Sequence, residues 1–95
     1  MTIALRCFAA AREAAGRAND TFAAADAPTL GAVLALACDR YGEEFARVLA
    51  TARVWVNGDE AERGTDTPLR DGDEVAVLPP VSGGMGDEAR TESAE

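Results

Sequence analysis

Lysine and histidine are absent from this 95-residue sequence, and all nine basic residues are arginine. These two missing side chains are the ones that most often serve as general base or amine nucleophile in enzymes. Free-standing catalysis by this chain is therefore not expected. The lack of lysine also means that no side chain can accept an isopeptide bond.

Cysteine and long apolar runs are scarce too. Cys7 and Cys38 are the only cysteines and no CxxC spacing occurs, so we expect two buried free thiols, with no metal framework and no disulfide scaffold. No run approaches the roughly 18 apolar residues of a membrane span. The chain enters a predicted strand directly, so we expect no signal peptide and a cytoplasmic location.

The charge balance is acidic, with a formal net charge of −8. This charge disfavours nucleic acid and anionic membranes as partners. Four of the acids lie in residues 85–95, which lack aromatic residues and any periodicity. We therefore predict one folded domain over residues 1–84 and a disordered acidic tail over residues 85–95.

Apolar periodicity predicts the order of the elements. A main helix begins after Thr29 as N-cap and ends at Gly42. Asn57-Gly58 is a strong hairpin signal. Shorter helical segments are predicted at 9–15 and 43–50, a short return strand or loop at 60–63, and full strands at 2–8, 21–25, 53–56 and 74–78.

One helix laid across a mixed sheet of four or five strands is the economical way to bury these apolar faces. The order of elements predicts an α+β fold of the β-grasp (ubiquitin-like) type. A ferredoxin-like fold would need a second full helix, and the pattern predicts none of that length.

Strand parity predicts an exposed apolar group on the face of the sheet away from the helix. The opposite face takes the regularly alternating residues such as Leu5 and Val77, which leaves Phe8, Trp55 and Leu78 outside. Several apolar residues together on an open sheet face are typical of a partner-binding surface. The alternatives are a bulge that reverses one strand, or burial of the group under residues 9–16.

The last strand leads into a distinctive segment, Leu78-Pro79-Pro80-Val81-Ser82-Gly83-Gly84. The prolines stop the strand because they lack amide donors, and the glycines suit an extended arm that enters a narrow channel. Asp71 and Asp73 precede this strand and Glu74 begins it; we expect these three acids to be solvated turn residues without a bound metal.

Four segments form a distinctive set: the opening RCFAAAREAAG (residues 6–16), the turns VNG (56–58) and LRDGDEV (69–75), and the ending LPPVSGG (78–84). Together they resemble the small, sulfur-carrying subunit of molybdopterin synthase. The thiamine sulfur carrier is similar in fold and in its terminal glycines, but the opening and the ending favour the molybdopterin branch.

The resemblance implies a carrier that binds no cofactor itself. An ATP-dependent adenylating enzyme would activate the carboxylate of Gly84, the residue after Gly83, and sulfur would then replace AMP to leave a thiocarboxylate. The arm runs from Pro79 through Pro80, Val81 and Ser82 to the two glycines. It would enter the large synthase subunit and give its sulfur to cyclic pyranopterin monophosphate. Phe8 and Leu78 would lie in the docking surface.

Met85 follows Gly84 in peptide linkage, so this chemistry requires a peptidase to remove residues 85–95. Two alternatives stay open. The chain could carry sulfur for another pathway, such as thiamine, cysteine, tRNA thiolation or a secondary metabolite. It could also be a β-grasp binding module that is never activated.

Overall fold

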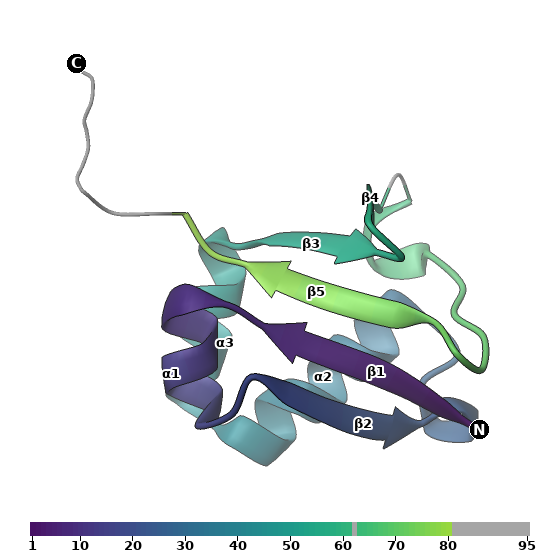
Figure 1. The fold of residues 1–95 in the computed structure, drawn as a ribbon, viewed down its shortest axis with the longest axis horizontal. Coiled ribbons are helices and arrows are strands. Elements are labelled where there is room, and N and C mark those ends of the chain that lie inside the picture. Colours follow the sequence, from purple (N-terminus) through teal and green to yellow (C-terminus); the bar gives the residue numbers. More distant parts are fainter. Residues whose placement is uncertain (62, 81–95) are drawn as a thin grey trace.

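The computed structural model describes residues 1–61 and 63–80. Its elements, shown in Figure 1, are β1 (Thr2–Cys7), α1 (Ala9–Ala15), β2 (Asn19–Ala23), α2 (Leu30–Tyr41), α3 (Glu43–Thr51), β3 (Arg53–Val56), β4 (Asp59–Glu60) and β5 (Glu74–Leu78). Two short 3₁₀ turns, Ala24–Asp26 and Gly64–Asp66, lie in the connections.

The five strands form one sheet in the order β2-β1-β5-β3-β4. The central pair, β1 and β5, is parallel, and every other pair is antiparallel. A parallel pair requires a crossover, and the helices between β2 and β3 supply it on one side of the sheet (Figure 1). The predicted β-grasp fold with a mixed sheet is confirmed.

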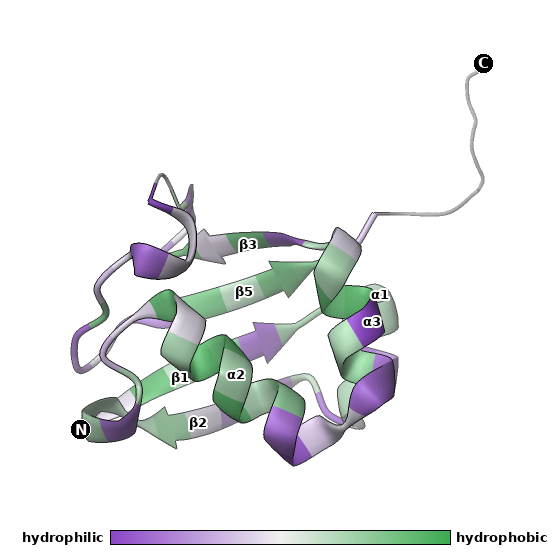
Figure 2. Ribbon diagram, turned by 180° about the vertical axis from the view of Figure 1, so that it is seen from behind, coloured by the Kyte–Doolittle hydropathy of each residue, from purple (hydrophilic) through white to green (hydrophobic). Residues whose placement is uncertain are grey.

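The core lies between the sheet and the helices, which all cover the same face (Figure 2). The inward residues of β1 and β5 are fully buried, and α2 and α3 close over them with Val33 and Phe45. β1 and β5 lie inside the sheet, so their inward side chains are covered on all sides; they are Ile3, Leu5, Cys7, Val75 and Val77.

The main helix begins and ends as its sequence predicts. The Thr29 hydroxyl accepts a hydrogen bond from the Ala32 amide at 3.2 Å, as an N-cap does. Gly42 ends the helix at φ +102°, a conformation that side chains with a Cβ rarely adopt. α3 follows immediately and is nine residues long, which places Phe45 in the core.

The prediction for the second strand was wrong by two residues. The expected strand 21–25 lies at Asn19–Ala23, and residues 24–26 form a 3₁₀ turn instead. The reason is the antiparallel pairing with β1, which places Ile3 opposite Phe22 and extends to Arg6 opposite Asn19. A pairing partner thus overrides the weak local preference of this segment.

The first strand is one residue shorter than predicted, because Phe8 is the N-cap of α1 and not a strand residue. Its backbone stays extended, and its amide donates to the Val77 carbonyl at 3.2 Å. Phe8 therefore still continues the line of β1. Within residues 1–61 and 63–80, no helix has the length and apolar character needed to cross a membrane.

Candidate functional site

Strand register sets a first row of side chains across the outer face, at the end where the chain leaves β5. Leu78 pairs with Arg53 of β3, and Phe8 follows Cys7, which pairs with Val77. Phe8, Leu78 and Arg53 therefore lie side by side across β1, β5 and β3. They point away from the helices because Cys7 and Val77 point toward the core.

A second row lies two residues further back. Arg6 pairs with Ala76, Ala76 pairs with Trp55, and Trp55 pairs with Glu60. Positions two apart on a strand share a face, so this row lies on the same outer surface as the first. We call Phe8, Trp55, Ala76 and Leu78 the outer patch.

The outer patch presents aromatic surface to solvent. Phe8 and Trp55 are each 38% exposed, whereas Leu78 is half-buried between its neighbours. The predicted outward orientation of all three is therefore present in the structure. α1 does not fold over them, because it lies at the end of the sheet and packs against α3 (Figure 1). Aromatic residues held on a rigid sheet are suited to anchor a partner protein.

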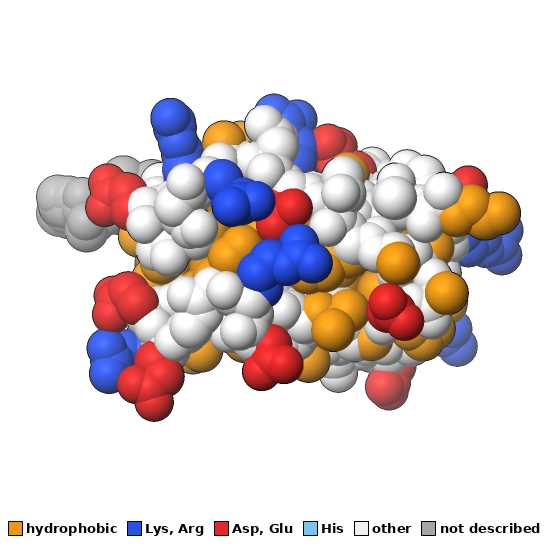
Figure 3. Space-filling model, turned by 90° about the horizontal axis from the view of Figure 1, so that it is seen from below, with side chains coloured by type: hydrophobic (Ala, Val, Ile, Leu, Met, Phe, Trp, Pro, Cys, Tyr) orange, Lys and Arg blue, Asp and Glu red, His pale blue; other side chains and the backbone are white. Residues whose placement is uncertain are grey.

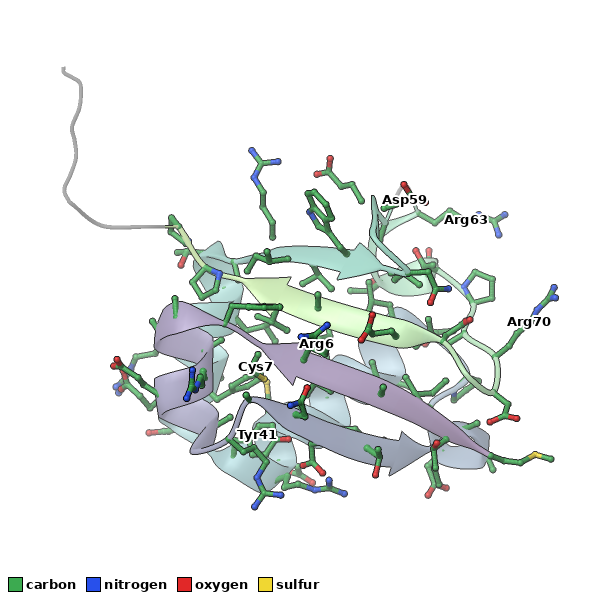
Figure 4. The ribbon with its side chains drawn as sticks, viewed as in Figure 1. Arg6, Cys7, Tyr41, Asp59, Arg63 and Arg70 are labelled. Carbon is green, nitrogen blue, oxygen red and sulfur yellow. The ribbon has the colours of Figure 1, made fainter. Side chains whose placement is uncertain are left out.

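Two ion pairs flank the outer patch. Arg6 lies 3.5 Å from Glu74, with its guanidinium 5.4 Å from the centre of the Phe8 ring (Figure 4). Arg53 lies 3.5 Å from Glu60 beside Trp55. Such exposed pairs contribute little to stability. Their effect is to neutralise the charges around an apolar centre, which is the composition of a protein-binding surface.

The arm leaves from the middle of the sheet. β5 has β1 on one side and β3 on the other. Val77 is therefore paired on both sides, with Cys7 and Val54, and Leu78, which ends the strand, is paired with Arg53. Pro79 is half-buried and Pro80 is exposed. Four further residues reach about 13 Å when extended. The predicted site residues Val81, Ser82, Gly83 and Gly84 lie outside the described residues.

The acidic turn before β5 has structural partners. Asp73 accepts hydrogen bonds from the Arg70 amide at 2.8 Å and from Asn57 Nδ2 at 3.0 Å. Asp71 accepts from the Thr2 amide at 2.8 Å. These bonds hold the turn against β1 and the β3–β4 hairpin. In the part of the chain that the structure describes, no group of three or more potential metal ligands occurs.

The comparisons with known proteins agree with this geometry. A model of the ThiS family matches residues 5–84, which include both rows of the outer face and the glycines of the arm. The chain belongs to the ThiS family, a family of ubiquitin-like sulfur carriers. No curated protein matches the sequence.

Solved structures similar to this ThiS-family chain have the same fold. Small archaeal modifier protein 1 from Haloferax volcanii is 26% identical, with a TM-score of 0.76 over 88% of this chain and 100% of that chain. The Haloferax volcanii HVO 2177 protein is 35% identical, with a TM-score of 0.72 over 88% and 87%. A chain from the complex of subunits 1 and 2 of molybdopterin-converting factor from Helicobacter pylori is 26% identical, with a TM-score of 0.65 over 88% and 100%.

Neither cysteine of this ThiS-family chain is placed to act as a nucleophile. Burial raises the pKa of the Cys7 thiol, and the nearby Asp20 carboxylate adds to this effect. Burial, followed by the charge of Asp39, also raises the pKa of Cys38, which is half-buried and not fully buried as predicted. A high pKa keeps a thiol protonated and unreactive. The sulfur chemistry of the family is therefore not expected at these side chains.

One cluster was not predicted from the sequence. The Asp20 carboxylate of β2 accepts hydrogen bonds from the Tyr41 hydroxyl and from the Arg40 guanidinium at 2.8 Å, both at the end of α2. Twenty residues separate the partners, so no local pattern indicates the contact. Partial desolvation raises the pKa of Asp20. The hydrogen bonds from Tyr41, Arg40 and the Thr21 amide, with the charge of Arg40, outweigh it and lower the pKa to about 2.

Proposed function

We propose that this chain carries sulfur at the carboxyl group of Gly84 and delivers it to cyclic pyranopterin monophosphate during molybdopterin synthesis. The proposed partners are an adenylating enzyme and the large subunit of molybdopterin synthase. The observation that carries the proposal is that the outer patch lies directly beside the exit of the Pro-Pro-Val-Ser-Gly-Gly arm. A partner that binds the patch would find the arm within reach of its own active site.

The proposed chemistry requires two transfers at one carbon. The Gly84 carboxylate attacks the α-phosphorus of ATP and releases pyrophosphate, which gives an acyl adenylate. A sulfide equivalent then attacks the carbonyl carbon and releases AMP, which leaves the thiocarboxylate. ATP is the cosubstrate of the adenylating enzyme in this scheme, and the carrier itself is not required to bind it.

The chain is suited to be the protein substrate of these steps, which carries the sulfur, and not their catalyst. It has no histidine and no lysine, and its cysteines are buried or half-buried. The rigid sheet supplies a docking surface, and the arm supplies the reactive carboxyl group. The similarity to a chain from the complex of subunits 1 and 2 of molybdopterin-converting factor supports a two-subunit arrangement of this kind.

The proposal includes removal of residues 85–95 by a peptidase, because Gly84 has a free carboxylate only after that cleavage. The test compares full-length chain with a form ending at Gly84, each incubated with ATP, sulfide and the adenylating enzyme from the same organism. We expect the shortened form alone to gain the mass difference between sulfur and oxygen. If neither form gains this mass, the carrier proposal is wrong.

A second candidate is sulfur delivery to another pathway. This candidate is retained because the matching model is that of the ThiS family as a whole and not of the molybdopterin branch alone. Adding the thiocarboxylate form to the large synthase subunit with cyclic pyranopterin monophosphate separates the two candidates. Formation of the dithiolene product supports molybdopterin synthesis. A stable thiocarboxylate that gives no product favours the other pathway, and a chain that is never adenylated would be a binding module.

A further inference from the structure

β2 forms one end of the sheet, and among residues 1–61 and 63–80 no strand pairs with its side away from β1, which is a free edge. The hydrogen bonds from Cys7 to Ala18 and from Ala24 to Met1 set the alternation of the β1–β2 ladder. In that alternation, the backbone groups of residues 20 and 22 point toward β1, and those of residues 19, 21 and 23 point outward. A free edge of this kind is a template for pairing with another strand.

Both outward backbone groups of the central residue, Thr21, are already occupied. Its amide donates to the Asp20 Oδ1 atom at 2.8 Å. Its carbonyl accepts from an Arg40 guanidinium nitrogen at 3.1 Å. The same nitrogen lies 2.8 Å from Asp20 Oδ2, so one arginine holds the carbonyl and the carboxylate together. Arg40 of α2 and Asp20 of β2 thus occupy the hydrogen-bonding positions on Thr21 that a pairing strand would use.

The two blocking side chains are themselves held in place. Arg40 stacks over the Phe22 ring, with its guanidinium carbon 4.1 Å from the ring centre. Asp20 is only 13% exposed and also accepts from the Tyr41 hydroxyl, and Arg17 lies 3.6 Å away. Figure 3 looks onto this edge and shows basic and acidic side chains in contact over hydrophobic atoms. Arg40 and Asp20 therefore cover this edge as part of a packed cluster of side chains.

We propose that Arg40 and Asp20 close the β2 edge against strand pairing with a second copy of this chain. A second copy is the fitting partner because residues 19–23 are centred on Thr21. Two such strands can pair antiparallel about a two-fold axis, with the two Thr21 residues exchanging N–H···O bonds. Closing this edge does not cover the outer patch, which lies on the face of the sheet formed by β1, β5 and β3.

The test measures the oligomeric state of the full-length chain by sedimentation velocity over a series of concentrations. Arg40→Ala removes the cap on the Thr21 carbonyl and loosens Asp20, and we expect a dimer of doubled mass that increases with concentration. Arg40→Met, which favours helix about equally well and has no hydrogen-bond donor, should do the same with less loss of packing over Phe22. Arg47→Ala is the matched control, because it removes an equal charge from an exposed residue of α3 whose partner, Glu44, is on the same helix.

A second substitution locates the new contact. Thr21→Pro removes the outward amide, which β1 does not use, and proline is tolerated on strand edges. We expect Arg40→Ala/Thr21→Pro to be monomeric again. Circular dichroism establishes that each variant is folded, which is expected because the Arg40 side chain is 46% exposed. A folded Arg40 variant that stays as monomeric as Arg47→Ala would overturn the proposal. A dimer that Thr21→Pro leaves intact, or a wild-type dimer that Thr21→Pro dissociates, would overturn it as well.

Discussion

Phe8 and Leu78 lie side by side on the outer face of the sheet, although 70 positions separate them in the sequence. Cys7 and Val77, the residues before them, are partners in the parallel pairing of β1 with β5, and the Phe8 amide donates to the Val77 carbonyl. The opening motif of the chain and its closing arm are thereby joined into one surface. Mutation of either residue should affect the same binding event.

Under the proposed function, Trp55→Ala and Phe8→Ala should each weaken binding to the proposed partner, the large subunit of molybdopterin synthase. Both rings are partly exposed on the outer patch, and loss of an aromatic anchor costs about 2 kcal/mol or more, which is about a 30-fold increase in Kd. Isothermal titration calorimetry measures the effect, with Arg47→Ala on the opposite side of the molecule as control. Unchanged affinity in both patch variants would place the interface elsewhere.

Asp20→Asn should reduce the amount by which the free energy of unfolding falls at acid pH. The pKa of Asp20 is lowered to about 2 in the folded state, so the folded chain favours the ionised carboxylate. The stability it contributes is present above the unfolded pKa of about 3.9 and is lost as the pH falls toward about 2. Urea denaturation should show the wild type losing about 1–2 kcal/mol more than the variant over this interval.

The matched control for this pH effect is Asp39→Asn, an exposed acid on α2 next to Arg40. It removes the same charge from a side chain that makes none of the hydrogen bonds of the Asp20 cluster. Equal acid profiles for the wild type and Asp20→Asn would show that the cluster around Asp20 does not favour the charged form.

Thr29→Ala should lower the free energy of unfolding by about 1 kcal/mol, because the Ala32 amide at the start of α2 loses the hydroxyl that caps it. Thr29→Ser keeps a hydroxyl at the same place and should retain most of the stability. Chemical denaturation of the three proteins checks this order. A serine variant as unstable as the alanine variant would point to a packing role for the threonine methyl group.

Phe45→Ala should destabilise the fold by about 3–5 kcal/mol, which is a large part of the stability of a domain this small. Phe45 is fully buried and joins α3 to the core, with its ring centre 5.0 Å from that of Tyr41. Thermal unfolding measures the loss. Glu44→Ala, the neighbouring exposed position, should change stability by no more than about 0.5 kcal/mol, and an equal effect at both positions would rule out core packing as the cause.

The sequence alone was sufficient for the parts of this protein that depend on local chemistry. Alternation in residues 74–78 predicts β5, Thr29 and Gly42 predict the ends of α2, and Asn57-Gly58 predicts the hairpin, whose two residues have φ of +53° and +86°. These signals depend on neighbours one to four residues away, so a single chain carries them completely. The resemblance of residues 1–84 to sulfur carriers is also a property of the sequence.

Only the tertiary structure decided where β2 lies and what protects its edge. The strand occupies residues 19–23 because it pairs with β1, and Asp20 then meets Arg40 and Tyr41 across a separation of about 20 residues. The position of Phe8 beside Leu78 likewise depends on the parallel register between β1 and β5, which are distant in the sequence. Contacts of this kind follow from how the sheet is assembled, and no pattern within one segment contains them.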